Sequence, residues 1–402
     1  MARALYVDID LIHLNPTATY FPQLIEAAVP DVSFYGPGFS APDVLAKGLL
    51  NWVRETGPYE VIFIGPNSPI LVDDLNDSVI QGTLAYMHRY TAHGHTDAEI
   101  VAFLKDLSAV LPDIDIEHRI ATSLNFDYYG ATDVQVQRLQ DLHLTLLGPN
   151  EQFVRPLAEL PAFVTQEKHY QRKKARLSDC WFDFLHAHPE RVITALHYVV
   201  PSEFSFTPIH QRRPVVAVPG VEYHLRKEAN AALRRTGIPM ASKWYFHLFR
   251  VMGRLGVPVH GHPLGLHVYN QCFQRTLKTS RYVYTARGGF GLPIRKFFEI
   301  PAAGALMLCS PCTGYEELGF VDGVHYYCVE PDELPKVLQE LTRTGAGHDV
   351  AVAGRQVTAN NHSLQARARQ IALCLNALAK GTYRGARWRQ GEFFVEERSC
   401  VE

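Results

Sequence analysis

The stretch RYVYTARGGFGLPIRKFFEIPAAGALMLC, from Arg281 to Cys309, has the most informative pattern in this chain. Its first residues, Tyr282 to Thr285, are aromatic and β-branched and predict a strand. A glycine-rich break follows, and then a helix that ends at Gly304. The apolar run 305–308 predicts the next buried strand. Strand, glycine loop, helix and strand together predict one crossover unit of an α/β sheet.

Side chains in this unit predict a site for an anion. A helix that starts after a glycine loop, here near Pro293, offers free N–H groups and a partial positive charge, which suit a phosphate. Arg287 lies at the mouth of the loop, and Arg295 could fork onto a phosphate or carboxylate. Glu299, four residues further on the same face, could accept the hydroxyls of a ribose. An ordinary Arg295–Glu299 surface pair, worth roughly a few tenths of a kcal/mol, explains the spacing equally well.

The run from Leu292 to Leu308 resembles the C-terminal block of the group 1 glycosyltransferases, in particular the branch typified by spore-maturation-type proteins. That block has an arginine, an aromatic residue, a glutamate, small residues, a glycine and three apolar residues in this order. The resemblance continues through the segments Gly314–Phe320, Asp322–Val324, Pro331–Leu334, Ala353–Arg355 and Asn361–Ser363. It covers the last third of the chain and is weaker in the middle.

The resemblance implies a GT-B fold, in which two doubly wound, Rossmann-like domains face a cleft. It also implies transfer of a sugar from a nucleotide-diphosphate donor, with Glu299 holding the ribose and the glycine loop holding the diphosphate. The residues expected to contact the donor are Gly220, Tyr223, Arg226, Arg287, Gly288, Gly289, Arg295, Glu299 and Glu317. Many relatives carry a further glutamate where this chain has Gly291, so the contact to the donor sugar and the stereochemistry stay open.

Three residues are candidates for the chemistry. Glu316 would lie near the donor sugar. Relatives mostly retain the anomeric configuration, with the leaving phosphate taking the acceptor's proton, and retention is the favoured expectation. An inverting enzyme would need a protein base, for which Asp127 or His13 could serve. A nucleotide-sugar 2-epimerase of the same shape, and a non-catalytic relative that only binds a nucleotide sugar or a glycan, remain alternatives.

The composition of the chain limits which classes of partner and cofactor we expect it to bind. The 402 residues suffice for two domains, and 39 basic against 41 acidic residues give no excess suited to nucleic acid. No apolar run is as long as a membrane span, and the start of the chain lacks the apolar core of a signal peptide. Seven scattered cysteines favour free thiols and a cytoplasmic location. No glycine lies between Asp10 and Gly36, which argues against a nicotinamide-dependent dehydrogenase.

No metal and no cofactor are expected beyond the nucleotide sugar as co-substrate. The triplet Asp8-Ile9-Asp10 resembles the D-x-D of metal-dependent transferases, but alternate strand residues share a face in any case. The acceptor could be a glycan, a lipid or a small molecule. The basic run Lys168–Arg176 fits a solvated helix face, and an anionic acceptor or a peripheral membrane contact is the sharper alternative.

Alternating strand and helix patterns predict the domains. We expect an acceptor-side domain over residues 1–205, a nucleotide-sugar domain over residues 206–380, and a tail over residues 381–402 that packs back on the first domain. The sequence also predicts single helices over residues 41–54 and 243–255, the second with Trp244, Leu248 and Val251 in one stripe.

Overall fold

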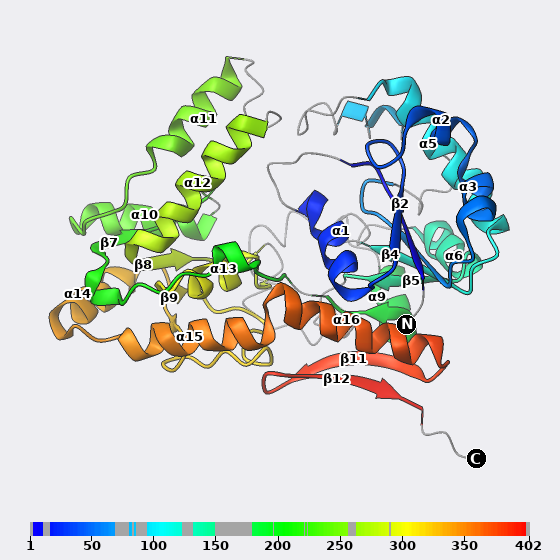
Figure 1. The fold of residues 1–402 in the computed structure, drawn as a ribbon. Helices are drawn as coiled ribbons and strands as arrows, with labels where there is room; N and C mark the ends of the chain where they lie inside the picture. The colour runs from blue at the N-terminus through cyan, green and yellow to red at the C-terminus, as the bar shows by residue number, and fades with distance from the viewer. Residues whose placement is uncertain are drawn as a thin grey trace.

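The computed structural model describes residues 3–10, 17–68, 80–82, 84–85, 95–122, 132–148, 179–195, 197–220, 222, 224–255, 263–288 and 291–398. This part of the chain forms two parallel sheets with helices around them, and a separate hairpin near the C-terminus (Figure 1). The alternation of strands and helices that the sequence predicted is therefore confirmed.

The first sheet has the strand order β2-β1-β3-β4-β5-β6, and all its strands are parallel. The strands are β1 Ala4–Val7, β2 Val32–Tyr35, β3 Val61–Ile64, β4 His118–Thr122, β5 Leu144–Leu147 and β6 Val192–Ile193. The helices around this sheet are α1 Thr17–Ala28, α2 Pro42–Ala46, α3 Leu49–Thr56, α5 Asp97–Val110, α6 Asp133–Asp141 and α9 Asp179–Ala187.

Alternate residues of β1 enter two separate hydrophobic cores, one on each face of the first sheet. Leu5 and Val7 pack with residues of α3, α5, α6 and α9. Ala4 and Tyr6 pack with residues of α1 and of α16, Leu364–Ala379, which comes from the far end of the chain. Both faces are covered, as expected for a parallel sheet.

The single helix predicted over residues 41–54 is instead two helices, α2 and α3. The break falls at Gly48, whose φ of +83° is a conformation that L side chains rarely adopt. Asp106 on α5 accepts a hydrogen bond of 2.7 Å from the backbone N–H of Leu49 and so holds the start of α3. The break is thus fixed by a residue 57 positions away, which a local pattern does not reveal.

The second sheet has the order β10-β9-β8-β7 and is also parallel. Its strands are β7 Arg213–Ala217, β8 Ser280–Thr285, β9 Leu306–Cys309 and β10 Tyr327–Cys328. Its helices are α10 His224–Arg235, α11 Trp244–Arg254, α12 Pro263–Thr279, α13 Lys296–Ala302, α14 Leu334–Thr344 and α15 His348–Asn361. Strands β8 and β9, with α13 between them, form the predicted crossover unit.

The stripe predicted on α11 lies on the outside of the helix. Trp244, Leu248 and Val251 are exposed, whereas Tyr245 and Phe249 are buried. The buried pair takes the inner face because both rings pack edge-on against Tyr269 of α12, with centroids 5.5 and 5.4 Å away. Aromatic pairs of this kind add to the stabilisation that burial provides.

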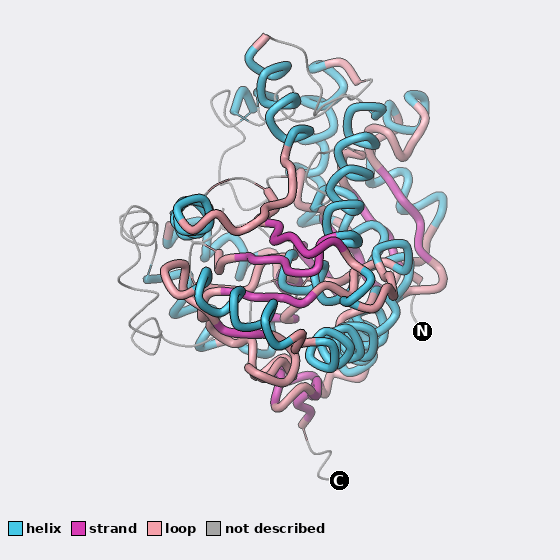
Figure 2. Tube along the Cα trace, turned by 90° about the vertical axis from the view of Figure 1, so that its left-hand side faces the viewer, coloured by secondary structure: helices cyan, strands magenta, loops and turns pink. Residues whose placement is uncertain are grey.

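The last segments of the chain return to the first sheet. Helix α16 packs along α1, and the antiparallel hairpin of β11 Tyr383–Arg389 and β12 Glu392–Glu397 lies beside it (Figures 1 and 2). The Tyr383 hydroxyl donates a hydrogen bond of 2.7 Å to the Val192 carbonyl in β6. Gly319 and Gly391 are so close that a Cβ on either would lie within 2.9 Å of the other's Cα, so the hairpin turn also contacts the second domain.

Candidate active site

Three elements converge at the carboxyl end of β7. The chain turns at Gly220, which has a φ of +84°. A Cβ at this position would lie 3.0 Å from Nη1 of Arg226 on α10 and 3.2 Å from Nζ of Lys296 on α13. Glycine therefore allows two cations to share the space directly over the turn. Ligands in open α/β sheets bind beyond the carboxyl ends of the strands, where this turn lies.

The two cations disfavour each other when no anion is present. Burial, together with the neighbouring charge of Arg226, lowers the pKa of Lys296 to about 8, while Glu299 acts in the opposite direction. Arg226 is buried and donates a hydrogen bond of 3.2 Å to the Pro219 carbonyl. Within the described residues no carboxylate pairs with Lys296, whose Nζ lies 5.6 Å from the centre of the Phe273 ring. A dianionic group at Gly220 would relieve this repulsion.

Arg295 belongs to a buried network of three charged groups. It pairs through Nη1 with Glu299, as the i,i+4 spacing predicted, and donates through Nη2 to Oε1 of Glu203 at 2.7 Å. The three side chains are 18%, 5% and 10% exposed, so this is no solvated surface pair. The flanking carboxylates raise the pKa of Arg295 against the opposing effect of burial, and burial raises the pKa of Glu203.

Sequence reasoning missed Glu203. This residue ends the 3-10 helix Pro201–Glu203, and its carboxylate also accepts a hydrogen bond of 2.9 Å from the backbone N–H of Val200. Proline at the first position of a helix and glutamate at the third are both local signals of a helix start. No local signal, however, predicts its contact with Arg295, which lies 92 positions further along the chain.

The predicted free N–H groups at the start of α13 are largely used within the turn before it. The helix begins at Lys296 instead of near Pro293. The N–H of Phe297 donates to the Ile294 carbonyl at 2.8 Å, and those of Phe298 and Glu299 donate to the Arg295 carbonyl at 3.0 Å each. In the loop, the N–H of Gly288 donates to the Leu292 carbonyl at 2.8 Å. Positive charge at the site therefore comes mainly from side chains.

The other predicted residues in the described part lie elsewhere around the second sheet. Arg287 donates to the Pro311 carbonyl at 3.2 Å and lies 3.5 Å from a carboxylate oxygen of Glu330, beyond β9. Glu316 is exposed, and the carbonyl of Glu317 accepts a hydrogen bond of 2.9 Å from Gly391 in the hairpin turn. The site over Gly220 thus brings together Arg226, Lys296, Arg295 and Glu299, and its lysine was absent from the predicted set.

Some predicted positions lie outside the described residues. They are His13, Asp127, Tyr223, Gly289 and the basic run 168–176. Their proposed roles stay predictions.

A second set of buried polar side chains, His197, His362 and Arg367, lies near the Glu203–Arg295–Glu299 network. Burial, with the charges of Arg295 and Arg367, lowers the pKa of His197 to about 3. Nη2 of Arg367 lies 3.1 Å from Nδ1 of His362, and Nε2 of His362 lies 2.9 Å from the Leu318 carbonyl. Because arginine can only donate, Nδ1 accepts and Nε2 carries the proton, so His362 is neutral. Burial lowers the pKa of His362 well below 6.5, in agreement with this assignment.

The described residues contain no group of three His, Cys, Asp or Glu side chains arranged to hold a metal ion. Asp8, in the predicted D-x-D, is buried and accepts hydrogen bonds from the Asn67 backbone, the Asn67 amide and the Ser68 hydroxyl at 3.2, 3.0 and 3.0 Å. Burial raises its pKa to about 7, whereas Asp10 is exposed. Asp8 therefore anchors the chain after β3.

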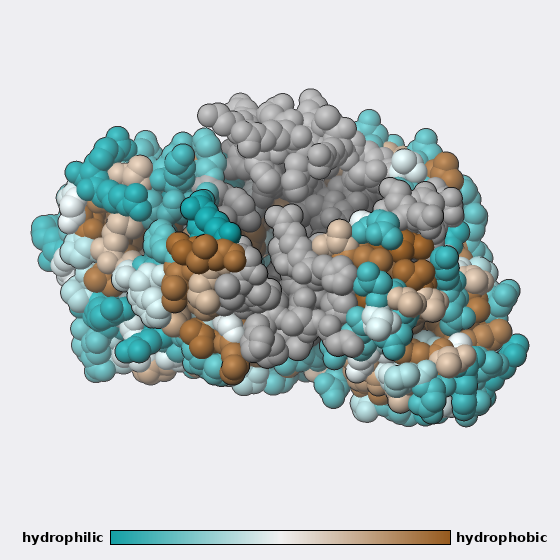
Figure 3. All heavy atoms as spheres, turned by 90° about the horizontal axis from the view of Figure 1, so that it is seen from above, coloured by the Kyte–Doolittle hydropathy of each residue, from teal (hydrophilic) through white to brown (hydrophobic). Residues whose placement is uncertain are grey.

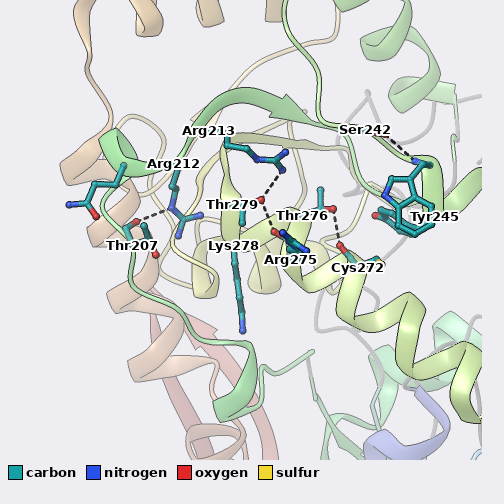
Figure 4. Close-up of a pocket in the computed structure, with 12 residues that line it drawn as sticks. Thr207, Arg212, Arg213, Ser242, Tyr245, Cys272, Arg275, Thr276, Lys278 and Thr279 are labelled. Atoms are coloured by element: carbon teal, nitrogen blue, oxygen red, sulfur yellow. Dashed lines mark hydrogen bonds between the residues drawn. The ribbon is translucent and has the colours of Figure 1, made fainter.

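A cavity of about 570 Å³ lies beside Arg213 at the amino end of β7 (Figure 4), whereas Gly220 follows the carboxyl end of this strand. Arg212, Arg213, Arg275 and Lys278 line it, together with hydroxyl groups and the ring of Trp244 at the foot of α11. The guanidinium of Arg212 donates to backbone carbonyls there, including Thr207 at 2.8 Å and Leu277 at 3.0 Å. This cavity is separate from the site at Gly220.

Comparison with known proteins gives one partial family match and several similar structures. Residues 231–372 match the family described as "Glycosyl transferase-like". The structure of Anabaena Alr3699/HepE in complex with UDP aligns with a TM-score of 0.52 and 11% identity, over 93% of this chain and 100% of that chain. The complex of the same protein with UDP and glucose gives a TM-score of 0.51 and 10% identity, over 94% and 100% of the two chains.

These matches confirm the predicted GT-B fold, and residues 231–372 are similar to the glycosyl transferase-like family. The finer assignment to the spore-maturation-type branch stays a prediction. No curated protein gives a significant sequence match. Among the described residues, no helix is both long and apolar enough to cross a bilayer.

Proposed function

We propose that this protein is a glycosyltransferase that takes a sugar from a nucleotide-diphosphate donor, with the diphosphate bound over Gly220 between Arg226 and Lys296, and places it on an acceptor hydroxyl. The observation that carries this proposal is the convergence of two cations from different helices on one glycine turn. Glu299, one turn into α13, would hold the ribose through a carboxylate already oriented by Arg295.

In this proposal the cations act on the leaving group. Breaking the anomeric bond leaves negative charge on the diphosphate, and positive groups already in place stabilise that charge without reorganising. Arg226 and Lys296 would supply this charge, so the reaction would need no metal. We propose retention of configuration, with the leaving phosphate accepting the acceptor's proton.

Two further details belong to the proposal. The Anabaena neighbour was solved with UDP and glucose, which makes UDP and UDP-glucose the first donors to test. Six cysteines in the described part are free thiols, which supports a cytoplasmic location.

Binding of UDP to Lys296→Met and to wild type, measured by isothermal titration calorimetry, tests the site. Since a hydrogen bond to a charged group contributes about 1.5–3 kcal/mol, we expect the variant to bind UDP roughly tenfold or more weakly. The control is Lys227→Met, which removes an exposed lysine next to Arg226. Wild-type affinity in Lys296→Met, or an equal loss in Lys227→Met, would contradict the proposed site.

A transfer assay tests the activity. Purified protein is mixed with UDP-sugars, with and without a panel of glycan, lipid and small-molecule acceptors, and products are identified by mass spectrometry. We expect release of UDP that depends on an acceptor, together with a glycosylated product. An epimerised donor formed without acceptor would indicate a 2-epimerase, and binding without any turnover would indicate a non-catalytic relative.

A further inference from the structure

Acidic residues are absent from one long segment of the chain. The protein has 41 Asp and Glu residues, yet none lies between Glu228 and Glu299. The same segment contains the basic residues Arg234, Arg235, Lys243, Arg250, Arg254, Arg275, Lys278, Arg281, Arg287, Arg295 and Lys296. The donor site accounts for only a few of these. The segment also includes α11 and α12, which rise side by side away from the second sheet (Figure 1).

Large apolar side chains are exposed along these two helices. The exposed fractions are 57% for Trp244, 46% for Leu248, 51% for Val251, 74% for Leu255, 70% for Leu264 and 46% for Val268. Thirteen large apolar side chains are exposed in the described part of the chain, and six of them lie here. Seen from above, brown hydrophobic residues gather over α11 and α12 (Figure 3). Such a concentration marks an interaction surface.

Cations lie beside this apolar surface. Arg250 and Arg254 are exposed on the side of α11 that adjoins the stripe. At the foot of the helix pair, Arg275 and Lys278 line the cavity next to Trp244 (Figure 4). Within the described residues, no carboxylate forms an ion pair with Arg250, Arg254, Arg275 or Lys278, so their charge is available to an external anion.

The positive charge of this face limits which kind of partner can bind to it. In a symmetric dimer the same patch meets itself, so Arg250 and Arg254 would face their own copies without a compensating carboxylate. A bilayer with anionic lipids has no such cost, because its headgroups attract arginines while the apolar side chains enter the boundary with the acyl chains. We infer that the outer face of α11 and α12 docks on the surface of an anionic lipid bilayer. This inference is independent of the donor site at Gly220.

Flotation of the full chain with lipid vesicles tests the inference. Vesicles of pure phosphatidylcholine are compared with vesicles that contain about a third phosphatidylglycerol. We expect binding to the anionic vesicles only, and a decrease as salt is raised, because salt screens the attraction. Arg250→Gln and Arg254→Gln should each lower partitioning about fivefold. Leu248→Gln and Leu255→Gln should each lower it roughly tenfold, because each removes an apolar group from the interface.

Matched controls separate docking from a general change of the surface. Leu373→Gln changes an exposed leucine on α16, and Arg235→Gln changes an exposed arginine on α10. Both should bind vesicles as wild type does, and all variants should bind UDP unchanged, since none touches the donor site. Equal binding to neutral vesicles, no binding to either kind, or wild-type binding by the α11 variants would overturn the inference. A dimer that Leu248→Gln abolishes, without vesicle binding, would assign the face to a second copy.

Discussion

Lys296 is the residue whose charge state matters most for the proposed donor site. Its pKa of about 8 is lower than the usual 10.5, so below about pH 8 the lysine is protonated in the folded chain. Above pH 8 the folded chain holds fewer protons than the unfolded chain, and Lys296 alone makes stability rise as pH increases towards 10.5. A bound diphosphate would favour the protonated form and raise this pKa again.

Donor binding should therefore depend on pH through Lys296. We expect UDP affinity to change little between about pH 7 and 8 and to fall above pH 8, because binding then requires uptake of a proton by Lys296. Calorimetry at about pH 9 in buffers of different ionisation enthalpy should detect this proton uptake. Lys296→Met should lose both the uptake and the pH dependence. If the wild type shows neither, Lys296 does not contact the ligand.

At the scale of elements, the Glu203–Arg295–Glu299 network joins α13 to the segment that links the two sheets. Removing one partner of a buried charged group typically costs about 3–5 kcal/mol, because the remaining charges stay buried without compensation. We expect Arg295→Met to lower the free energy of unfolding by about this amount. A loss of donor binding in this variant would then have two possible causes, the folding defect and the loss of a residue at the donor site.

A neutral version of the network separates these effects. The triple variant Glu203→Gln, Arg295→Met, Glu299→Gln removes all three charges, and we expect it to recover much of the stability that Arg295→Met loses. Urea denaturation followed by circular dichroism measures both variants. A triple variant that is less stable than Arg295→Met would show that the network contributes by its hydrogen bonds and not by balancing charge.

Much of the arrangement of elements could be predicted from sequence, because strands and helices differ in the spacing of their apolar residues. The strands around Tyr284 and Leu308, and the Arg295–Glu299 pair between them, are local features of this kind. The break at Gly48 and the partner Glu203 were missed because residues distant in sequence fix them. The outward position of the stripe on α11 was not predicted, because apolar spacing identifies a stripe but not whether protein, lipid or water covers it.

The hairpin of β11 and β12 was missed despite a local signal. Gln390 and Gly391 both have positive φ, at 51° and 86°, as in the tight turns that connect neighbouring antiparallel strands. Trp388, Phe393 and Val395 flank this turn with the spacing of a two-faced ribbon. Reading the tail as a pair of strands was therefore possible from these residues alone.

On the scale of the whole molecule, the hairpin joins chain segments that are almost 200 positions apart. Tyr383 is buried, and its hydroxyl satisfies the Val192 carbonyl in the first sheet. Tyr383→Phe leaves that carbonyl without its donor, and we expect the free energy of unfolding to fall by about 1–2 kcal/mol. Urea denaturation measures the change. Tyr327→Phe in the second sheet is the control. An equal loss of unfolding free energy in that variant would show that the Tyr383–Val192 hydrogen bond has no special role.

The return of the chain also has a consequence for its biosynthesis. The ribosome extrudes β1 long before residues 364–397, which form the helix and the hairpin on one side of the first sheet. Until those residues emerge, the nascent protein exposes the apolar side chains of α1 that α16 later shields. The first sheet is therefore completed only after the second sheet has been translated, and in that interval its uncovered apolar surface favours aggregation.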